Sequence, residues 1–127
     1  MSKEEILAMK PGRELNIAVA EVVMKHKVIV DEIFGEMERY IANDGSSVYS
    51  NLQPYSKDRS IAQQVVDKLK NNYNARVEFN YHTENWEAEF SESETGLSFG
   101  TVSVLDAPEA ICKAALLAIL GKRRIVR

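Results

Sequence analysis

Residues 52–69 constrain the fold more than any other part of this chain, because they hold a strong helix signal behind a defined start. Pro54 disfavours helical backbone at the residue before it and ends any helix arriving from upstream. Ser56 or Asp58 can then accept hydrogen bonds from the free N–H groups of a following first turn. Tyr55 precedes that cap, where its side chain can pack back onto the helix. An apolar stripe follows at helical spacing: Ile61, Ala62, Val65, Val66 and Leu69.

Two further segments predict helices. In residues 11–25, Pro11 suits a first turn and the cationic residues 25–27 suit the negative end of the helix dipole. The second helix is expected to follow the cap Asp106 and to end at Gly121. It is apolar over most of its circumference, so we expect it to be buried or to dock on a second copy of the chain.

The remaining segments predict strands. Residues 28–33 begin with three β-branched residues, whereas residues 34–41 fit a helix or a strand. The turn Asn43-Asp44-Gly45 indicates a hairpin. Apolar side chains alternate in residues 76–81 and 86–90, and residues 97–105 follow as a third strand. The sequence thus predicts an α+β fold: one domain, residues 1–127, in which an antiparallel sheet of three to five strands packs with three helices. Residues 1–10 are expected to be loose and residues 122–127 to form a basic tail.

Composition narrows the function classes. The 127 residues carry a net charge of −3, which argues against a protein whose main role is to bind nucleic acid. The basic tail is the exception, and we interpret it as a solvated terminus, with a contact to nucleic acid or to an acidic partner as the alternative. No apolar run is long enough to predict a membrane segment. The single cysteine, Cys112, allows no internal disulfide and favours the reducing cytoplasm.

Catalytic signals are weak, so we expect no enzyme, cofactor or metal site. His26 and His82 have no cysteine or carboxylate at a ligand spacing, and the glycines form no phosphate-binding loop. Cys112 lies among apolar neighbours and is interpreted as a core residue. The carboxylates at positions 87, 89, 92 and 94 are interpreted as a solvated face.

A binding site is harder to exclude. Trp86 and Tyr55, together with other aromatic residues, offer faces on which a base could stack. Arg59 and Lys113 could supply positive charge to a phosphate. The alternative is that the aromatic residues are ordinary core and that Lys113 extends its charge to the surface.

Six short pieces occur in one order along residues 12–120: Gly12-Arg13-Glu14-Leu15, Val19-Ala20-Glu21 with Val23-Met24, Asp44-Gly45, Pro54-Tyr55-Ser56-x-Asp58, Trp86-x-Ala88-x-Phe90, and Pro108-x-Ala110-Ile111-Cys112 with Ala114-Ala115-Leu116. No single piece is specific, but in this order they resemble the phage ABA sandwich domain proteins, which are small proteins of tailed phages and prophages. Residues 28–38 carry no matching motif, so the resemblance leaves the topology of residues 28–50 open.

The resemblance implies a function. The Thoeris anti-defence sponge proteins are similar in size, origin and helix-sheet layout, and they sequester cyclic ADP-ribose-type immune signals between subunits, without catalysis. In this chain Trp86 would stand for their aromatic residue and Lys113 for an arginine. We therefore expect a homo-oligomeric phage or prophage protein of the host cytoplasm that binds a cyclic nucleotide-derived signal. The alternative is a phage accessory or structural protein that acts through protein contacts.

Overall fold

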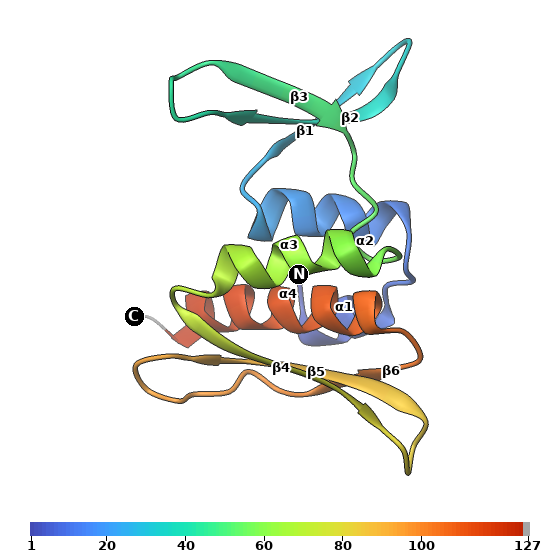
Figure 1. Cartoon of the computed structure of the whole chain (residues 1–127), viewed down its shortest axis with the longest axis vertical. Helices are drawn as coiled ribbons and strands as arrows, with labels where there is room; N and C mark the ends of the chain where they lie inside the picture. The colour runs from blue at the N-terminus through green and yellow to red at the C-terminus, as the bar shows by residue number, and fades with distance from the viewer. Residues whose placement is uncertain (126–127) are drawn as a thin grey trace.

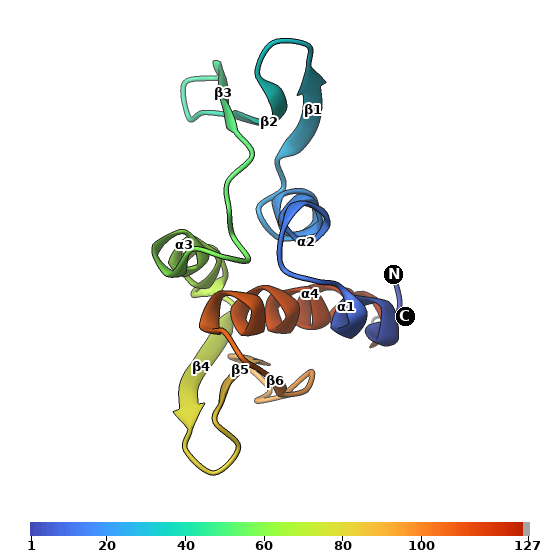
Figure 2. The same ribbon diagram turned by 90° about the vertical axis from the view of Figure 1, so that its right-hand side faces the viewer.

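The structure, a computed structural model, describes the backbone of residues 1–125 and the side chains of residues 1–121 (Figure 1). Helices lie between two antiparallel sheets, and Figure 2 shows the same layers from the side. The helices are α1 (Lys3–Ala8), α2 (Arg13–Ala18), the π-helix η1 (Val19–Val23), α3 (Arg59–Leu69) and α4 (Ala107–Ile125). The first sheet contains β1 (Lys27–Asp31), β2 (Gly35–Ile41) and β3 (Ser47–Asn51); the second contains β4 (Tyr73–Asn80), β5 (Asn85–Glu92) and β6 (Val102–Val104). The predicted α+β class is confirmed, and the described strands divide into two sheets of three.

Helix α4 runs through the centre of the molecule. It contacts β5 and β6 on one side and α1, η1 and α3 on the others (Figure 2). Residues 110–118 of α4 are all buried. Its apolar circumference is therefore covered within one chain, so α4 is not itself a reason to expect an oligomer.

The end of α4 differs from the prediction. Gly121 does not close the helix, which continues to Ile125. A Cβ atom at Gly121 would lie 2.7 Å from Cδ1 of Phe99. The glycine therefore allows α4 to pack closely against Phe99 in the segment before β6. In the sequence it resembles a C-terminal cap only because it follows an apolar run.

Helix α3 begins where the sequence indicates. Asp58 is its cap, because its Oδ1 accepts hydrogen bonds from the backbone N–H groups of Ser60 and Ile61 at 2.9 and 3.2 Å. The Ser60 hydroxyl and these N–H groups hold the pKa of Asp58 below its ordinary value. Ser56, the other candidate cap, instead donates to Asn16 of α2 at 2.7 Å. The stretch before α3 thus also joins α3 to α2.

The predicted helix over residues 11–25 is present as α2 followed by η1. It begins at Arg13, because Gly12 has a φ of +137° and lies outside the helix. Lys25 has a φ of +62°, which turns the chain out of the helix and toward β1.

The N-terminal segment contains α1, which packs against α4. Ser2 and Glu5 form a capping box at its start, and Ile6 is buried in the core. The basic tail lies outside the described residues in part: positions 126–127 are not described, and neither are the side chains of positions 122–125.

Strand registers follow the predicted hairpins. Tyr40 pairs with Val48 across the Asn43-Asp44-Gly45 turn, so residues 35–41 form a strand, whereas Phe34 lies in the preceding turn. In the second sheet, Trp86 of β5 pairs with Phe79 of β4 and with Val104 of β6. The predicted third strand is shorter than expected, since residues 97–101 contribute only the isolated bridge of Ser98 to Ser91.

Candidate functional site

Two of the four predicted ligand residues lie together. Arg59, the first residue of α3, places its Cζ 5.2 Å from the centre of the Trp86 ring on β5. Phe79 contacts the same ring edge-on at 5.6 Å between centroids, and Tyr81 packs edge-on against Phe79 at 5.0 Å. Trp86 therefore already has partners within the chain, while Tyr81 is 85% exposed.

Tyr55 lies elsewhere, in a buried junction between the helices and the first sheet. Its hydroxyl donates to Oε1 of Glu38 at 2.6 Å, and the Gln53 N–H donates to Oε2 of Glu38 at 2.7 Å. Nδ1 of His26 lies 2.8 Å from the same Oε1. Burial, and then the hydrogen bond to Glu38, raise the pKa of Tyr55 above its ordinary value. Tyr55 and Glu38 are 1% and 0% exposed, so this junction supports the fold and offers no ligand surface as it stands.

Lys113 does not reach the surface, contrary to the expected alternative, because it is only 2% exposed. Its Nζ donates to the Leu7 carbonyl of α1 at 2.8 Å and to Glu109 at 2.6 Å. The buried Lys113 ammonium thus links α4 to α1 through its hydrogen bond to the Leu7 carbonyl. These hydrogen bonds give Lys113 a structural role in the packing of α1 against α4.

No motif or spacing in the sequence indicates the roles of Glu38 and His26. Met37 and Ile41 lie on one face of β2 and Glu38 lies on the other. The apolar pattern therefore predicts that the face with Met37 is buried and that Glu38 is exposed. Only the placement of Tyr55 and His26 beside it explains why a carboxylate points inward. His82, by contrast, is exposed, as predicted.

The face of the first sheet opposite Glu38 carries apolar residues among polar ones. Because side chains alternate along strands, it comprises residues from all three strands, which we call the outer sheet face: Lys27, Ile29, Asp31, Gly35, Met37, Arg39, Ile41, Ser47, Tyr49 and Asn51. Ile41 and Tyr49 are 61% and 52% exposed. At the tip of the β1–β2 hairpin, Ile33 and Phe34 are 85% and 67% exposed. This sheet stands away from the helices in both views (Figures 1 and 2).

The corresponding face of the second sheet is polar. Arg76 forms ion pairs with Glu78, Glu87 and Glu89 there. The Ser98 hydroxyl, and then Arg76, hold the pKa of Glu89 below its ordinary value. An antiparallel sheet with one solvated polar face is the ordinary arrangement, so the exposed Ile41 and Tyr49 on the outer sheet face depart from it.

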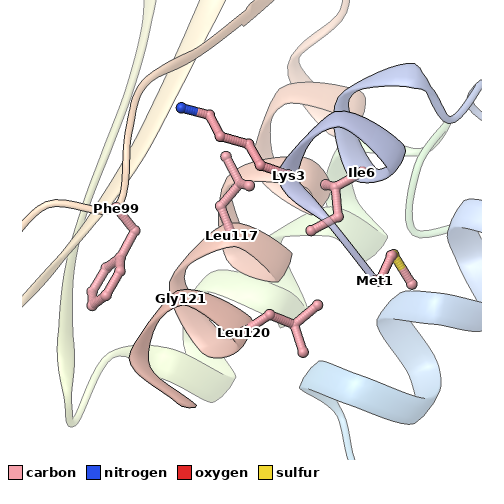
Figure 3. A pocket seen from close by; sticks show the side chains of 7 residues that line it. All are labelled: Met1, Lys3, Ile6, Phe99, Leu117, Leu120 and Gly121. Carbon is pink, nitrogen blue, oxygen red and sulfur yellow. The ribbon is translucent and has the colours of Figure 1, made fainter. Parts of the chain in front are cut away.

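Side chains of the described residues line several hollows, of which two bear on ligand binding. The first, shown in Figure 3, holds about 100 Å³ and is lined by Met1, Lys3, Ile6, Phe99, Leu117, Leu120 and Gly121. Sites for small ligands usually measure about 300–1,000 Å³, so it is too small for a nucleotide. The second is an open depression of about 530 Å³ at the start of α4, lined by Lys10, Pro11, Ser56, Lys57, Asp106 and Pro108. Neither contains a predicted ligand residue.

Other functional chemistry is limited in the part of the chain that the structure describes. No group of three or more histidine, cysteine or acidic side chains there is arranged to hold a metal ion. Within the same residues, no helix is both long and apolar enough to cross a membrane. Cys112 is a buried core residue, as predicted, and burial raises the pKa of its thiol to about 12.

Comparison with known proteins identifies the family. Residues 17–116 match the model of the phage ABA sandwich domain. The chain belongs to the phage ABA sandwich domain family. Its fold is similar to that in the 2.0 Å crystal structure of a phage protein from Bacillus cereus ATCC 14579, with 26% identity and a TM-score of 0.64 over 88% of this chain and 94% of that one. No curated protein matches the chain. The family predicted from the sequence is confirmed, and a relation to the Thoeris anti-defence proteins stays a prediction.

Proposed function

We propose that this phage ABA sandwich domain protein acts without catalysis, by binding protein through its outer sheet face. The observation that carries the proposal is the exposure of Ile41 and Tyr49 on a sheet that projects from the body and that also exposes apolar residues at the tip of its β1–β2 hairpin. Exposed apolar surface commonly marks an interaction site. Arg39 lies opposite Tyr49 on the same face, and arginine with tyrosine is a typical composition for the centre of an interface.

The placement of the predicted ligand residues supports this choice. Tyr55 and Lys113 make their hydrogen bonds inside the fold, and Trp86 already stacks with Arg59. A ligand that used all four would have to break two buried junctions. A protein partner on the outer sheet face requires no such change.

The test replaces Ile41 and Tyr49 together by lysine, because two charges at the centre of the face oppose burial. Tagged wild type and Ile41→Lys/Tyr49→Lys are recovered from infected host cells, and each candidate partner is then purified and its binding measured. Ser103→Lys, an exposed position on the second sheet, is the matched control. We expect at least one purified protein, or another copy of this chain, to bind the wild type and the control but not the double variant. Equal binding to all three would show that the outer sheet face is not the site.

A second candidate function is sequestration of a cyclic nucleotide-derived signal, which would act in the host cytoplasm against host defence. The cluster of Arg59, Trp86, Phe79 and Tyr81 favours it, because it joins an exposed aromatic ring to a guanidinium group. Tyr81 would stack on a base and Arg59 would pair with a phosphate.

This candidate is tested by heating the purified protein and assaying the supernatant for released nucleotide. Fresh protein is then titrated with cyclic ADP-ribose isomers and cyclic oligonucleotides. Binding that is lost in Arg59→Ala and Tyr81→Ala but kept in His82→Ala, with the ligand recovered unchanged, would support it. No binding across the panel would eliminate it.

A further inference from the structure

Strand β1 is an edge with an apolar centre. Among the described strands it pairs only with β2, so its other side presents backbone N–H and C=O groups without a strand partner. Its sequence is Lys-Val-Ile-Val-Asp, in which three β-branched residues adjoin one another. Natural proteins usually protect such an edge with central charges, proline or a bulge. Here the charges stand only at the two ends.

Those end charges are arranged symmetrically about Ile29. Lys27 and Asp31 lie two residues to either side, so all three share the outer sheet face. In an antiparallel pairing of β1 with β1 of a second copy, centred on Ile29, Lys27 would face Asp31 of the other copy at both ends. Val28 would face Val30, and the two Ile29 side chains would meet. Opposite-charge pairs and β-branched pairs are both favourable across strands.

From this complementarity we infer that the protein forms a two-fold homodimer in which the β1 edges of two copies pair antiparallel about Ile29, joining the first sheets into one six-stranded sheet. The inference deepens the proposed function, since it makes the two outer sheet faces continuous and names one partner as a second copy.

A strain within the single chain supports this pairing. Lys27 is directly opposite Arg39 on β2, and like charges in that position repel. The carboxylate of Asp31 from the other copy would lie beside these two cations. Within its own chain, Asp31 accepts the N–H groups of Ile33 and Phe34 on Oδ1, at 2.8 and 2.9 Å. These bonds fix its position and do not use Oδ2.

The same register also covers the hairpin tip. Five paired residues span only about 17 Å, whereas a stable interface buries about 800 Å² on each partner. Beyond Asp31 the chain turns back to Gly35 through residues 32–34, so the tip of the hairpin would lie past Lys27 of the other copy, near the end of its η1. Contact of the exposed Ile33 at this tip would add apolar area to that of the edge.

The other edges fit self-pairing less well. On β3, pairing about Tyr49 would place Ser47 opposite Asn51 and Val48 opposite Ser50, with no charge pair. On β4, pairing about Val77 would place Arg76 opposite Glu78, but Arg76 already forms ion pairs with Glu78, Glu87 and Glu89 of its own chain. β1 differs in having three adjoining β-branched residues between its two end charges.

Charge reversal tests the pairing. By light scattering at micromolar concentration, we expect the wild type to have twice the 14.3 kDa mass of the chain. Lys27→Asp should be a monomer, Lys27→Asp/Asp31→Lys should be a dimer again, and an equimolar mixture of the two single variants should form a heterodimer. Lys70→Asp, an exposed reversal on the other side of the fold, is the control, and melting curves check that Asp31→Lys still folds. A monomeric wild type, or a dimer that Lys27→Asp leaves intact, would overturn the inference.

A cross-link tests the register. Ile29→Cys should form an intermolecular disulfide under mild oxidation, because the two positions meet on the symmetry axis. The native Cys112 is 0% exposed and does not compete. Tyr49→Cys, the axis position for a dimer through β3, should remain reduced. A missing Ile29→Cys cross-link, or one formed by Tyr49→Cys instead, contradicts the β1 pairing. If the chain is a monomer and Ile41→Lys/Tyr49→Lys still abolishes binding of another protein, the self-pairing is wrong and the proposed function stands.

Discussion

At Glu38, donors from separate segments meet one buried carboxylate. Tyr55 comes from the turn before α3, Gln53 from the link after β3, and His26 from the link before β1. His26 also stacks on Tyr40 of β2, with ring centroids 4.7 Å apart. The link before β1 therefore contributes one contact to this carboxylate and the link between β3 and α3 contributes two, which fixes the sheet at its base.

The first prediction concerns this carboxylate. Glu38→Ala leaves three donors without their acceptor, and a buried polar group without a partner costs about 1–3 kcal/mol. We expect the free energy of unfolding to fall by about 3 kcal/mol in urea titrations, whereas Tyr55→Phe, which removes one donor, costs about 1 kcal/mol. Glu94→Ala, in an exposed loop, is the control and should change stability by less than about 0.5 kcal/mol. A Glu38→Ala effect no larger than that of the control would mean that water replaces the carboxylate.

The second prediction concerns Cys112, whose thiol has a pKa raised to about 12 by burial. In the unfolded chain the thiol ionises above about pH 8.5, so between these values the unfolded state holds fewer protons than the native state. The contribution of this thiol to the free energy of unfolding is therefore fully present below about pH 8.5 and is lost as the pH rises toward 12. The difference in unfolding free energy between wild type and Cys112→Ala should shrink by about 1–2 kcal/mol from pH 8 to pH 10. A constant difference would show that the native thiol also ionises.

At the scale of elements, the starts of the helices and the hairpins were predictable because each has a local cause. Asp58 and the Asn43-Asp44-Gly45 turn act through their own backbone. Tertiary contact decides where the local signal misleads or stays open. Gly121 resembles a cap but packs against Phe99, and residues 35–41, left open between helix and strand, form a strand through pairing on both sides.

The candidate site was less predictable than the elements. Arg59 and Trp86 meet because the start of α3 lies beside β5, and nothing local to either residue encodes that contact. Glu38 was missed because its burial depends on donors from distant segments. The outer sheet face was not predicted because the sequence left the topology of residues 28–50 open. Without the strand pairing, it was not possible to say which side of β2 is exposed.

The third prediction concerns the packing of α4 at Gly121. Glycine to alanine in an exposed helix interior stabilises by about 1 kcal/mol, but here the new Cβ meets the Phe99 ring. We expect Gly121→Ala to lower stability in the wild type and to raise it in a Phe99→Ala background. A double-mutant cycle on urea unfolding should therefore give an interaction energy of about 1–2 kcal/mol. An interaction energy near zero would show that Phe99 moves aside freely.

At the scale of the whole molecule, the two sheets are held to the helices in different ways. The second sheet buries Tyr73, Ala88, Phe90 and Val102 against the helix layer. In the first sheet, Glu38 is the one fully buried residue among those of β1, β2 and β3. One sheet is thus part of the core, and the other is attached mainly through hydrogen bonds at its base.

This difference predicts two levels of stability, measurable by amide hydrogen exchange on the monomeric Lys27→Asp variant so that pairing does not protect β1. Regions with few buried apolar contacts open at lower free energy, so amides of β2 should exchange at least about 10-fold faster than those of β5, a difference of about 1.4 kcal/mol. Adding Tyr55→Phe should speed exchange in β2 more than in β5. The substitution weakens the junction at Glu38 but does not change the packing of the second sheet against α4. Equal protection of β2 and β5 would mean that the first sheet unfolds only with the core. In that case the projecting sheet would be a rigid part of the domain, and its exposed face would meet a partner without a cost for ordering it.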